Sequence, residues 1–422
     1  MAVVKAFNCI RPNEKAVKDV AALPYDVYDR KEAKEAVKGK PLSFLNIDRP
    51  ETQFPDDFDM YSEEAYEKAK ELLDKEIADG TFLREPVPCY YVYEQTVEGG
   101  ELAPIMKGHS QTGIAACSSV DEYQNGIIKK HENTRADKEK DRIHHVDTCN
   151  AQTGPIFLAY RSSRELNRLT DDIKKDAPLY DFVSDDGIRH KIWRVSEPET
   201  TSAIENAFKE VPATYIADGH HRAASAVKVA LKRREEHPDY TGKEEYNYFL
   251  SVLFPDSELK ILPYNRAVRD LNGLTEQEFI DKINKAYTVK NCGENAVVPE
   301  EKGKCGMYLD HTWYELTAKD SVKSQDPVKG LDVSVLQDHV LMPLLGIEDP
   351  RTDKRISFIG GIRGTKELEK LVDREGYKAA FSMFPTGMQE LLSVADAKLL
   401  MPPKSTWFEP KLMSGIFIHQ IG

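Results

Sequence analysis

The sequence predicts a mixed α/β or α+β fold, because short apolar segments typical of strands alternate irregularly with amphipathic segments typical of helices. The composition is that of a globular protein, with 40% apolar and 31% charged residues. The chain has 422 residues, enough for two or three domains with sizeable cores. We place a boundary after Pro255, which predicts an N-terminal region over residues 1–255 and a second α/β domain over residues 256–422.

In the N-terminal region, the spacing of apolar residues predicts both strands and helices. Residues 61–80 have the pattern of an amphipathic helix that ends at a glycine. A charged helix is expected at residues 136–150 and a short helix at residues 203–210. Strands are expected at residues 2–10, 89–96, 114–117, 156–160 and 190–195.

The C-terminal domain is expected to alternate strands and helices in the same way. One of its helices carries His339 on an apolar stripe, and we interpret this histidine as buried structure. A glycine-rich turn, residues 360–364, lacks the spacing of a P-loop and is interpreted as a structural turn. Strands are expected near residues 261–267, 306–316, 356–359 and 379–385, and helices near residues 276–287, 332–345, 366–373 and 388–400.

A turn between an apolar strand and an alanine-rich helix is the most informative feature of the sequence. Residues 214–216 are β-branched or aromatic, and residues 223–232 have the composition and spacing of a helix. A helix N-terminus favours an anion such as phosphate, a glycine lets the backbone approach it, and an arginine can add a bidentate contact. An aspartate N-cap with a structural histidine pair is the alternative interpretation. The turn consists of Asp218, Gly219, His220, His221 and Arg222.

A second polar segment, residues 126–135, precedes the charged helix. Basic neighbours favour the ionised form of Glu132, and an ionised carboxylate beside a phosphate site would accept a proton or bind a metal. In the alternative interpretation, Asn133 and Thr134 are helix N-caps and Glu132 is an acid of the first turn. The basic neighbours are Lys129, Lys130, His131 and Arg135.

Near the C-terminus, residues 402–411 (PPKSTWFEPK) fit neither a regular helix nor a central strand, because the adjacent prolines 402 and 403 interrupt both. Two interpretations are equally favoured. In one, Trp407 and Phe408 anchor a well-packed loop. In the other, Lys404, Ser405 and Thr406 contact a nucleotide or a substrate.

Charge and cysteine usage limit the classes of partner and compartment. A net charge of −13 argues against nucleic acid and anionic membranes as partners, so a phosphate site must be locally basic. The six cysteines are scattered without a CxxC pair, which favours reduced thiols in the cytoplasm. Because no apolar run suits a signal peptide or a membrane span, we expect a soluble cytoplasmic protein. The sequence does not indicate the oligomeric state.

Together, the pair His131-Glu132 and residues 218–222 resemble the free-serine kinases, which have a ParB/sulfiredoxin-like fold. Over nearly its whole length, the chain is similar to a large microbial family of unknown function related to these kinases, the DUF1015 family. The segments that carry this similarity are residues 23–27 (LPYDV), 44–51 (FLNIDRPE), 154–157 (GPIF), 360–364 (GGIRG) and 401–411 (MPPKSTWFEPK).

The resemblance implies a ParB/sulfiredoxin-like catalytic core and a phosphotransferase that uses ATP or ADP with Mg²⁺. The acceptor would be a small hydroxylated metabolite, with free L-serine the leading candidate. By the same resemblance, Glu132 beside His131 is the general base. Residues 218–222 hold the nucleotide phosphates, with Asp218 a metal ligand. The segment between the His131-Glu132 pair and residues 218–222 is far longer than in the small kinases. We expect this difference to change the shape of the acceptor pocket.

Two other classes of protein remain as alternatives. A metal-dependent hydrolase is suggested by the donors His131, Glu132, His144, His145, His220 and His221. The HExxH spacing of zincins is missing, because Arg135 and Ala136 stand where a second histidine would be. A ParB-like regulator that responds to nucleotide without catalysis is the other alternative, and the acidic net charge counts against it.

Overall fold

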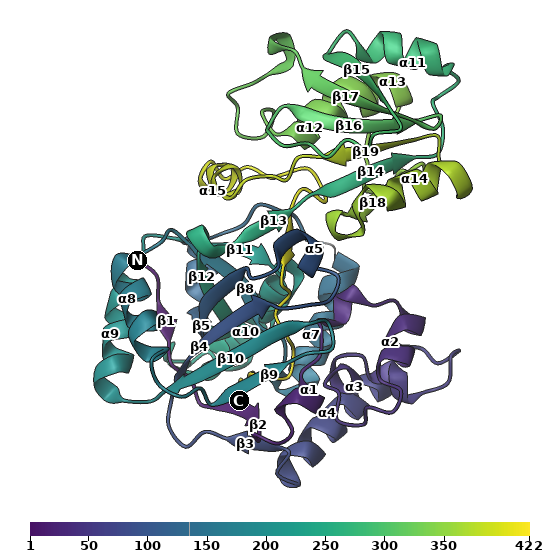
Figure 1. The fold of residues 1–422 in the computed structure, drawn as a ribbon. Coiled ribbons are helices and arrows are strands. Elements are labelled where there is room, and N and C mark those ends of the chain that lie inside the picture. Colours follow the sequence, from purple (N-terminus) through teal and green to yellow (C-terminus); the bar gives the residue numbers. More distant parts are fainter. Residues whose placement is uncertain (135) are drawn as a thin grey trace. The chain divides into compact units, whose positions relative to one another are not determined.

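The computed structural model describes residues 1–134 and 136–422, and the described chain forms two compact units. Unit 1 comprises residues 1–259 and 410–422, and unit 2 comprises residues 260–409 (Figure 1). The chain thus passes from unit 1 to unit 2 after Leu259, a few residues beyond the boundary placed from the sequence, and residues 410–422 return to unit 1. We call residues 410–422 the return segment.

The centre of unit 1 is a mixed sheet. Its strand order is β6-β11-β8-β12-β5-β4-β10-β9, with β1 paired to β5. β11 is parallel to β6 and β12 is parallel to β8, whereas the other pairs are antiparallel, which confirms the predicted mixed α/β class. The strands are β1 (Val4–Lys5), β4 (Tyr90–Val97), β5 (Ser110–Ser119), β6 (Ile128–Lys129), β8 (Ile156–Tyr160), β9 (Tyr180–Val183), β10 (Ile188–Val195), β11 (Thr214–Asp218) and β12 (Tyr248–Pro255).

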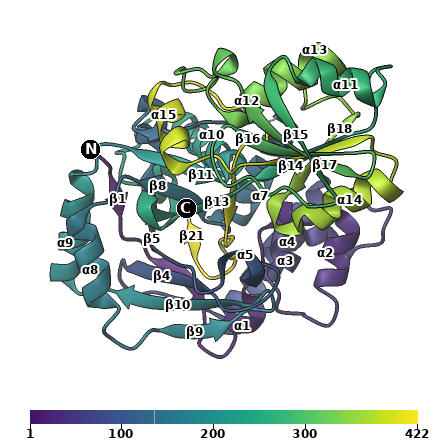
Figure 2. The same ribbon diagram turned by 45° about the horizontal axis from the view of Figure 1, so that its top comes forward.

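Helices cover one face of this sheet. Side chains alternate between the two faces of a strand, and Tyr90 and Val92 belong to the same apolar cluster as residues of α8, α9 and α10. α8 and α9 lie together beside β1 (Figure 1 and Figure 2). The helices of unit 1 are α1 (Val17–Val20), α2 (Arg30–Ala36), α3 (Leu45–Asp48), α4 (Glu63–Ala78), α5 (Ala103–Met106), α6 (Val120–Asn125), α7 (Ala136–Cys149), α8 (Arg164–Ile173), α9 (Pro198–Lys209) and α10 (His220–Glu236).

The opposite face of the sheet packs against the return segment. Tyr91 and Tyr93 alternate with Tyr90 and Val92, and their rings contact Phe417. The return segment ends in β21 (Ile418–Gln420), which joins a small sheet of order β3-β2-β21-β7. The other strands of this small sheet are β2 (Cys9–Pro12), β3 (Phe82–Arg84) and β7 (Ala151–Gln152).

The predicted N-terminal strand, residues 2–10, is wrong as a single element. β1 joins the central sheet, whereas β2 joins the small sheet, and Phe7 between them makes only an isolated bridge to Cys89. The charged helix begins at residue 136 as expected, and α9 begins five residues earlier than expected, at Pro198, which suits the first turn of a helix.

Unit 2 contains an antiparallel sheet of order β15-β17-β16-β19-β14-β18 and a separate pair, β13-β20. The expected paired strands near residues 306–316 are confirmed as β16 and β17. The strands are β13 (Lys260–Leu262), β14 (Tyr264–Val268), β15 (Tyr287–Gly293), β16 (Lys304–Leu309), β17 (Thr312–Ala318), β18 (Ile356–Gly360), β19 (Ala379–Met383) and β20 (Trp407–Glu409). The helices are α11 (Glu276–Ile283), α12 (Asp332–Leu336), α13 (Met342–Leu345), α14 (Gly364–Arg374) and α15 (Met388–Asp396).

The helix expected at residues 332–345 is interrupted. α12 and α13 are joined by a π-helical turn, Gln337–Leu341, which shifts the hydrogen-bond pattern before Pro343. Because proline has no N–H, it is tolerated in the first turn of a helix, and α13 begins at Met342 directly before it.

Candidate functional site

The turn between β11 and α10 is tighter than the sequence predicts. β11 extends to Asp218, and α10 begins at His220, three residues before its expected start. Only Gly219 lies between them, with a φ of 90° that L-residues rarely adopt. A Cβ atom at this position would also lie 3.0 Å from Nε of Arg222. The backbone angle therefore favours glycine here, and a side chain at this position would also crowd the guanidinium of Arg222.

The carboxylate of Asp218 is fixed at this turn by donors from two segments. It accepts a hydrogen bond of 2.8 Å from the backbone N–H of Gly219 and one of 3.2 Å from Nζ of Lys411. Nη2 of Arg222 lies 4.0 Å away. Burial alone would raise the pKa of this carboxyl, but Lys411 and Arg222 outweigh burial and hold the pKa of Asp218 well below its usual range. Asp218 is therefore ionised at neutral pH.

Two buried histidines meet beside the same turn. The rings of His131 and His220 are 4.6 Å apart between centroids and perpendicular, with exposed fractions of 0% and 7%. Burial lowers the pKa of His220 to about 4 and lowers the pKa of His131 well below its usual value, so both rings are neutral at pH 7. This contact brings the segment that carries Glu132, the next residue and partly exposed, to the start of α10.

The remaining residues predicted for the site make structural contacts, are exposed, or lie outside the described residues. The hydroxyl of Thr134 donates to Glu139 in α7, a contact that suits its interpretation as part of the helix entry. Asn133 is exposed. The carbonyl of His221 accepts a hydrogen bond of 2.8 Å from the hydroxyl of Ser225 within α10. Arg135, predicted to add local positive charge, lies outside the described residues.

The predicted contacts at Lys404, Ser405 and Thr406 fall in unit 2. The hydroxyl of Ser405 donates to the carbonyl of Pro402 over 2.6 Å, and its carbonyl accepts from Thr386 over 3.0 Å. These bonds are those of a packed loop. A Cβ atom at Gly360 would overlap the ring of Trp407, so the glycine-rich turn makes room for this loop. A ligand contact at residues 404–406 remains a prediction.

Sequence reasoning did not identify a small cavity in unit 1, of about 30 Å³, that Arg222 also lines. Its apolar lining residues are Val146, Ile156, Ala226 and Leu250, and its polar lining residues include Tyr25, Asp48, Arg142, His145, Thr153 and Arg222. The cavity has the size of a few polar atoms, far less than a nucleotide requires.

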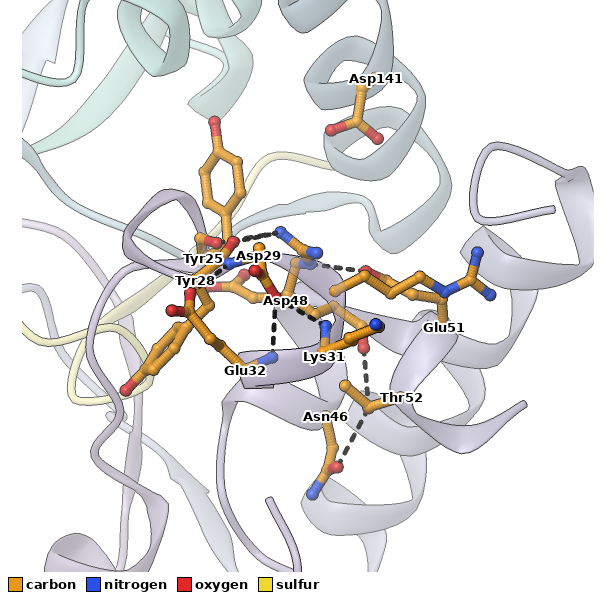
Figure 3. A network of polar contacts seen from close by, with 12 residues as sticks. Tyr25, Tyr28, Asp29, Lys31, Glu32, Asn46, Asp48, Glu51, Thr52 and Asp141 are labelled. Atoms are coloured by element: carbon orange, nitrogen blue, oxygen red, sulfur yellow. Dashed lines mark hydrogen bonds and ion pairs between the residues drawn. The ribbon is translucent and has the colours of Figure 1, made fainter. Parts of the chain in front are cut away.

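A buried polar network holds Tyr25 and Asp48, the two cavity residues that come before α4 in the sequence (Figure 3). Nε of Arg49 pairs with Glu51 at 2.5 Å, and Nη1 donates to the carbonyl of Tyr25 at 3.2 Å. The guanidinium of Arg142 stacks over the ring of Tyr25 at 4.1 Å and donates to the carbonyl of Asp48 at 3.3 Å. Burial raises the pKa of Tyr25 to about 12, which keeps its hydroxyl protonated.

The structure shows neither a ready metal site nor a membrane span in the part that it describes. Among the side chains that the structure describes, no three histidine, cysteine or acidic groups gather as a metal-binding group. No helix among the described residues is both long and apolar enough to cross a bilayer.

A family model described as "Protein of unknown function (DUF1015)" matches residues 4–334. The chain belongs to the DUF1015 family. No curated protein matches it. Among solved structures, a variant of free serine kinase in complex with ADP is 16% identical, with a TM-score of 0.33, over 70% of this chain and 87% of that one. SbnI with a C-terminal truncation, from Staphylococcus aureus, is 11% identical, with a TM-score of 0.38, over 71% and 85%. At these scores the likenesses carry no argument, and the ParB/sulfiredoxin-like core remains a prediction.

Three of the segments on which the resemblance to DUF1015 was based meet at the cavity. Residues 23–27 supply Tyr25, residues 44–51 supply Asp48, and residues 154–157 supply Gly154 and Ile156. The family resemblance of these segments was thus the signal in the sequence for the cavity. It does not reveal which of the segments are neighbours in space.

Proposed function

We propose that this DUF1015 protein is a nucleotide-dependent phosphotransferase that acts on a small hydroxylated metabolite, with L-serine as the leading acceptor. One observation carries the proposal: the contact of His131 with His220, which brings the Glu132 segment to the N-terminus of α10. A base and an anion-binding turn must share one site in phosphoryl transfer. The motifs that resemble the free-serine kinases support the same assignment.

In this proposal the nucleotide phosphates bind at the first turn of α10. The backbone N–H groups of His220, His221 and Arg222 point out of the helix start, where the helix dipole favours negative charge. Lys411 adds a positive charge at Asp218, and Lys130 lies close enough to affect the pKa of His220. These groups provide the local positive charge that a phosphate site requires in an acidic protein.

Asp218 is the residue that would hold Mg²⁺ supplied with ATP or ADP, since its carboxylate is ionised at this turn. A bound Mg²⁺ would neutralise phosphate oxygens. Glu132 would accept the proton of the acceptor hydroxyl as its oxygen attacks the terminal phosphorus in line. The bond to the leaving nucleotide then breaks, and the nucleotide departs with one phosphate fewer.

A single substitution tests the role of Glu132. Glu132→Gln keeps the size of the side chain but removes the proton acceptor, so turnover should fall by about 10²–10⁴-fold while nucleotide affinity barely changes. A coupled assay with ATP and ADP against amino acids and sugars gives the rate, and calorimetry gives the affinity. Glu101→Gln, at an exposed position of unit 1, is the matched control and should leave both unchanged. Near-normal turnover in Glu132→Gln would contradict the assignment.

A further inference from the structure

Residues 128–134, which we call the Glu132 segment, are held against the β11–α10 turn from both sides of Glu132. At the start of the segment, residues 128 and 129 form β6, which pairs in parallel with β11. Directly before Glu132, the ring of His131 contacts the ring of His220. These two contacts fix the segment up to Glu132, and the residues after it are fixed by different groups.

Thr134 anchors the end of the Glu132 segment. Its hydroxyl donates to Oε1 of Glu139 in α7, and Nζ of Lys228 in α10 donates to the other carboxylate oxygen, Oε2. The side chain of Glu139 is 8% exposed, whereas that of Lys228 is 55% exposed. Burial alone would raise the pKa of Glu139, but the bonds from Lys228 and Thr134 outweigh burial and lower this pKa. The carboxylate is therefore ionised at neutral pH, and each of its oxygens has a donor.

The backbone of Glu139 is bonded to the same helix as its side chain. The hydroxyl of Ser225, which is 0% exposed, donates to the carbonyl of His221 over 2.8 Å and to the carbonyl of Glu139 over 3.2 Å. Ser225 and Lys228 are three residues apart, so they lie on one face of α10. Through Glu139, the end of the Glu132 segment is therefore attached to the helix that provides the anion-binding turn.

We propose that Glu139 is a positioning residue of the phosphotransferase, which holds Glu132 at the phosphate site through its bond with Thr134. The inference rests on the proposed function, because Glu132 is the general base there. A base must lie within hydrogen-bond distance of the acceptor hydroxyl, and a misplacement of about 1 Å costs about 10²-fold in rate. A hydrogen bond to an ionised carboxylate is stronger than one to a neutral acceptor. A contact that only caps α7 would affect stability and leave the rate unchanged.

The turnover and the nucleotide affinity of three variants test the role of this bond. Thr134→Val keeps the shape of the side chain and removes the hydroxyl, so kcat should fall by about 10–100-fold while the Kd for ATP changes by less than about 2-fold. Thr134→Ser restores the hydroxyl and should keep kcat within about 3-fold of the unaltered protein. Glu139→Leu removes the acceptor and should lower kcat as much as Thr134→Val does. Normal turnover in Thr134→Val, or an equal loss in Thr134→Ser, would overturn the proposal.

An ion pair further along the same two helices provides a matched control. Nζ of Lys232 in α10 lies 2.5 Å from the carboxylate of Asp147 in α7, with exposed fractions of 52% and 27%. Asp147→Leu removes a carboxylate that links the two helices, but it does so about two turns away from Glu139. It should lower the free energy of unfolding and keep kcat. A loss of turnover as large as that of Glu139→Leu would assign the effect to the packing of α7 and refute the positioning role.

A double variant shows whether the bond acts through Glu132. Once Glu132→Gln has removed the proton acceptor, the position of this side chain no longer affects the rate. Adding Thr134→Val should therefore cause no further loss of turnover. A further loss equal to that of Thr134→Val alone would contradict an action through Glu132.

Hydrogen exchange separates a failure of this inference from a failure of the proposed function. The amides of the Glu132 segment should exchange faster in Thr134→Val than in Thr134→Ser or the unaltered protein, whether or not phosphate is transferred. Equal exchange rates in the three proteins would overturn the anchor. Faster exchange in a protein that transfers no phosphate from ATP or ADP would retain Glu139 as the anchor of this segment and refute the phosphotransferase.

Discussion

At the scale of single residues, burial determines the protonation of the site. His131 and His220 are kept neutral by desolvation, whereas Asp218 stays ionised because Lys411 and Arg222 outweigh the same desolvation. A neutral imidazole beside an anion-binding turn cannot attract phosphate by charge. Positive charge at the turn is supplied instead by Lys411 and Arg222, which lie beside Asp218.

The lowered pKa of His220 makes stability depend on pH. The unfolded chain binds a proton at this side chain near pH 6.5, whereas the folded protein does so only near pH 4. The contribution of His220 to stability is therefore complete above pH 6.5 and is lost as the pH falls towards 4. Between pH 7 and pH 5, the unaltered protein should lose up to about 2 kcal/mol more of its free energy of unfolding than His220→Gln does. Urea titrations at the two pH values measure this difference, and equal losses would contradict the buried neutral state.

The turn can be predicted from sequence at this scale, but the cavity cannot. The signals for residues 214–223 are local, since β-branched residues, one glycine and an alanine-rich segment follow one another directly. Tyr25, Asp48, Arg142 and Thr153 are far apart in the sequence, and each is unremarkable in its own segment. Their meeting depends on the way α3, α7 and the β7–β8 connection pack, which no local pattern specifies.

At the scale of elements, the left-handed residue between β11 and α10 is the decisive feature. The prediction placed the helix start at Ala223, because the apolar spacing and the alanine content typical of a helix begin there. In the structure the glycine reverses the chain within one residue, so these three residues form the first turn of α10. Their backbone N–H groups are thereby placed at the helix start, which the sequence-based boundary would not have given.

Gly219→Ala should lower both stability and nucleotide affinity. An alanine with a positive φ costs about 1–2 kcal/mol, and its Cβ atom would also displace Arg222. Gly126→Ala is a matched control, since Gly126 has a φ of 74° and a Cβ atom there would meet nothing within 4 Å. The control should lose a similar free energy of unfolding in urea and keep its affinity for ATP in calorimetry. A folded Gly219→Ala protein with full ATP affinity would remove this turn from the nucleotide site.

The return segment is the second decisive element, because it supplies Lys411. Two glutamines with 0% exposure fix its backbone: Gln95 donates to the carbonyl of Lys411 over 2.8 Å, and Gln111 donates to the carbonyl of Pro410 over 3.4 Å. The two side chains also bond to each other over 2.9 Å. The amide N–H groups of both glutamines are satisfied in this way, whereas Oε1 of Gln111 is buried without a hydrogen-bond partner among the described residues. Because buried amides are costly, the pair indicates that the position of residues 410 and 411 matters.

Lys411→Met keeps the length of the side chain and removes its charge. The negative charge of Asp218 beside the phosphates would then no longer be offset by Lys411. The free energy of ATP binding should therefore weaken by about 1.5–3 kcal/mol, with smaller losses for ADP and AMP. Added salt should reduce the difference in ATP affinity between the variant and the unaltered protein. Lys107→Met, at an exposed position of unit 1, should bind all three nucleotides normally. Equal losses for the three nucleotides would indicate a role in packing alone.

At the scale of the whole molecule, unit 2 is an insertion between two segments of unit 1. The chain leaves unit 1 after Leu259 and returns at Pro410, and the first and last strands of unit 2, β13 and β20, pair with Lys260 opposite Glu409. Opposite Cα atoms of an antiparallel pair are about 5 Å apart. The two ends of the insertion are therefore neighbours in space, although all the rest of unit 2 lies between them in the sequence.

Replacing residues 260–409 with a short Gly-Ser linker should leave a folded unit 1. The ends to be joined are already close, and the central sheet, the β11–α10 turn, Lys411 and the cavity all lie in unit 1. Circular dichroism, a cooperative thermal transition and ATP calorimetry would show whether the shortened chain folds and binds. An unfolded or aggregated product at low protein concentration would contradict the independence of unit 1.

The paired ends of β13 and β20 also bear on the history of the gene. A coding segment whose two junctions are adjacent in the folded protein is gained or lost in one in-frame event, with little change to the host fold. Unit 2 has the architecture of such a cassette. Because the family model extends into unit 2 as far as residue 334, we expect members of the DUF1015 family to carry this cassette, joined to unit 1 at the same two points.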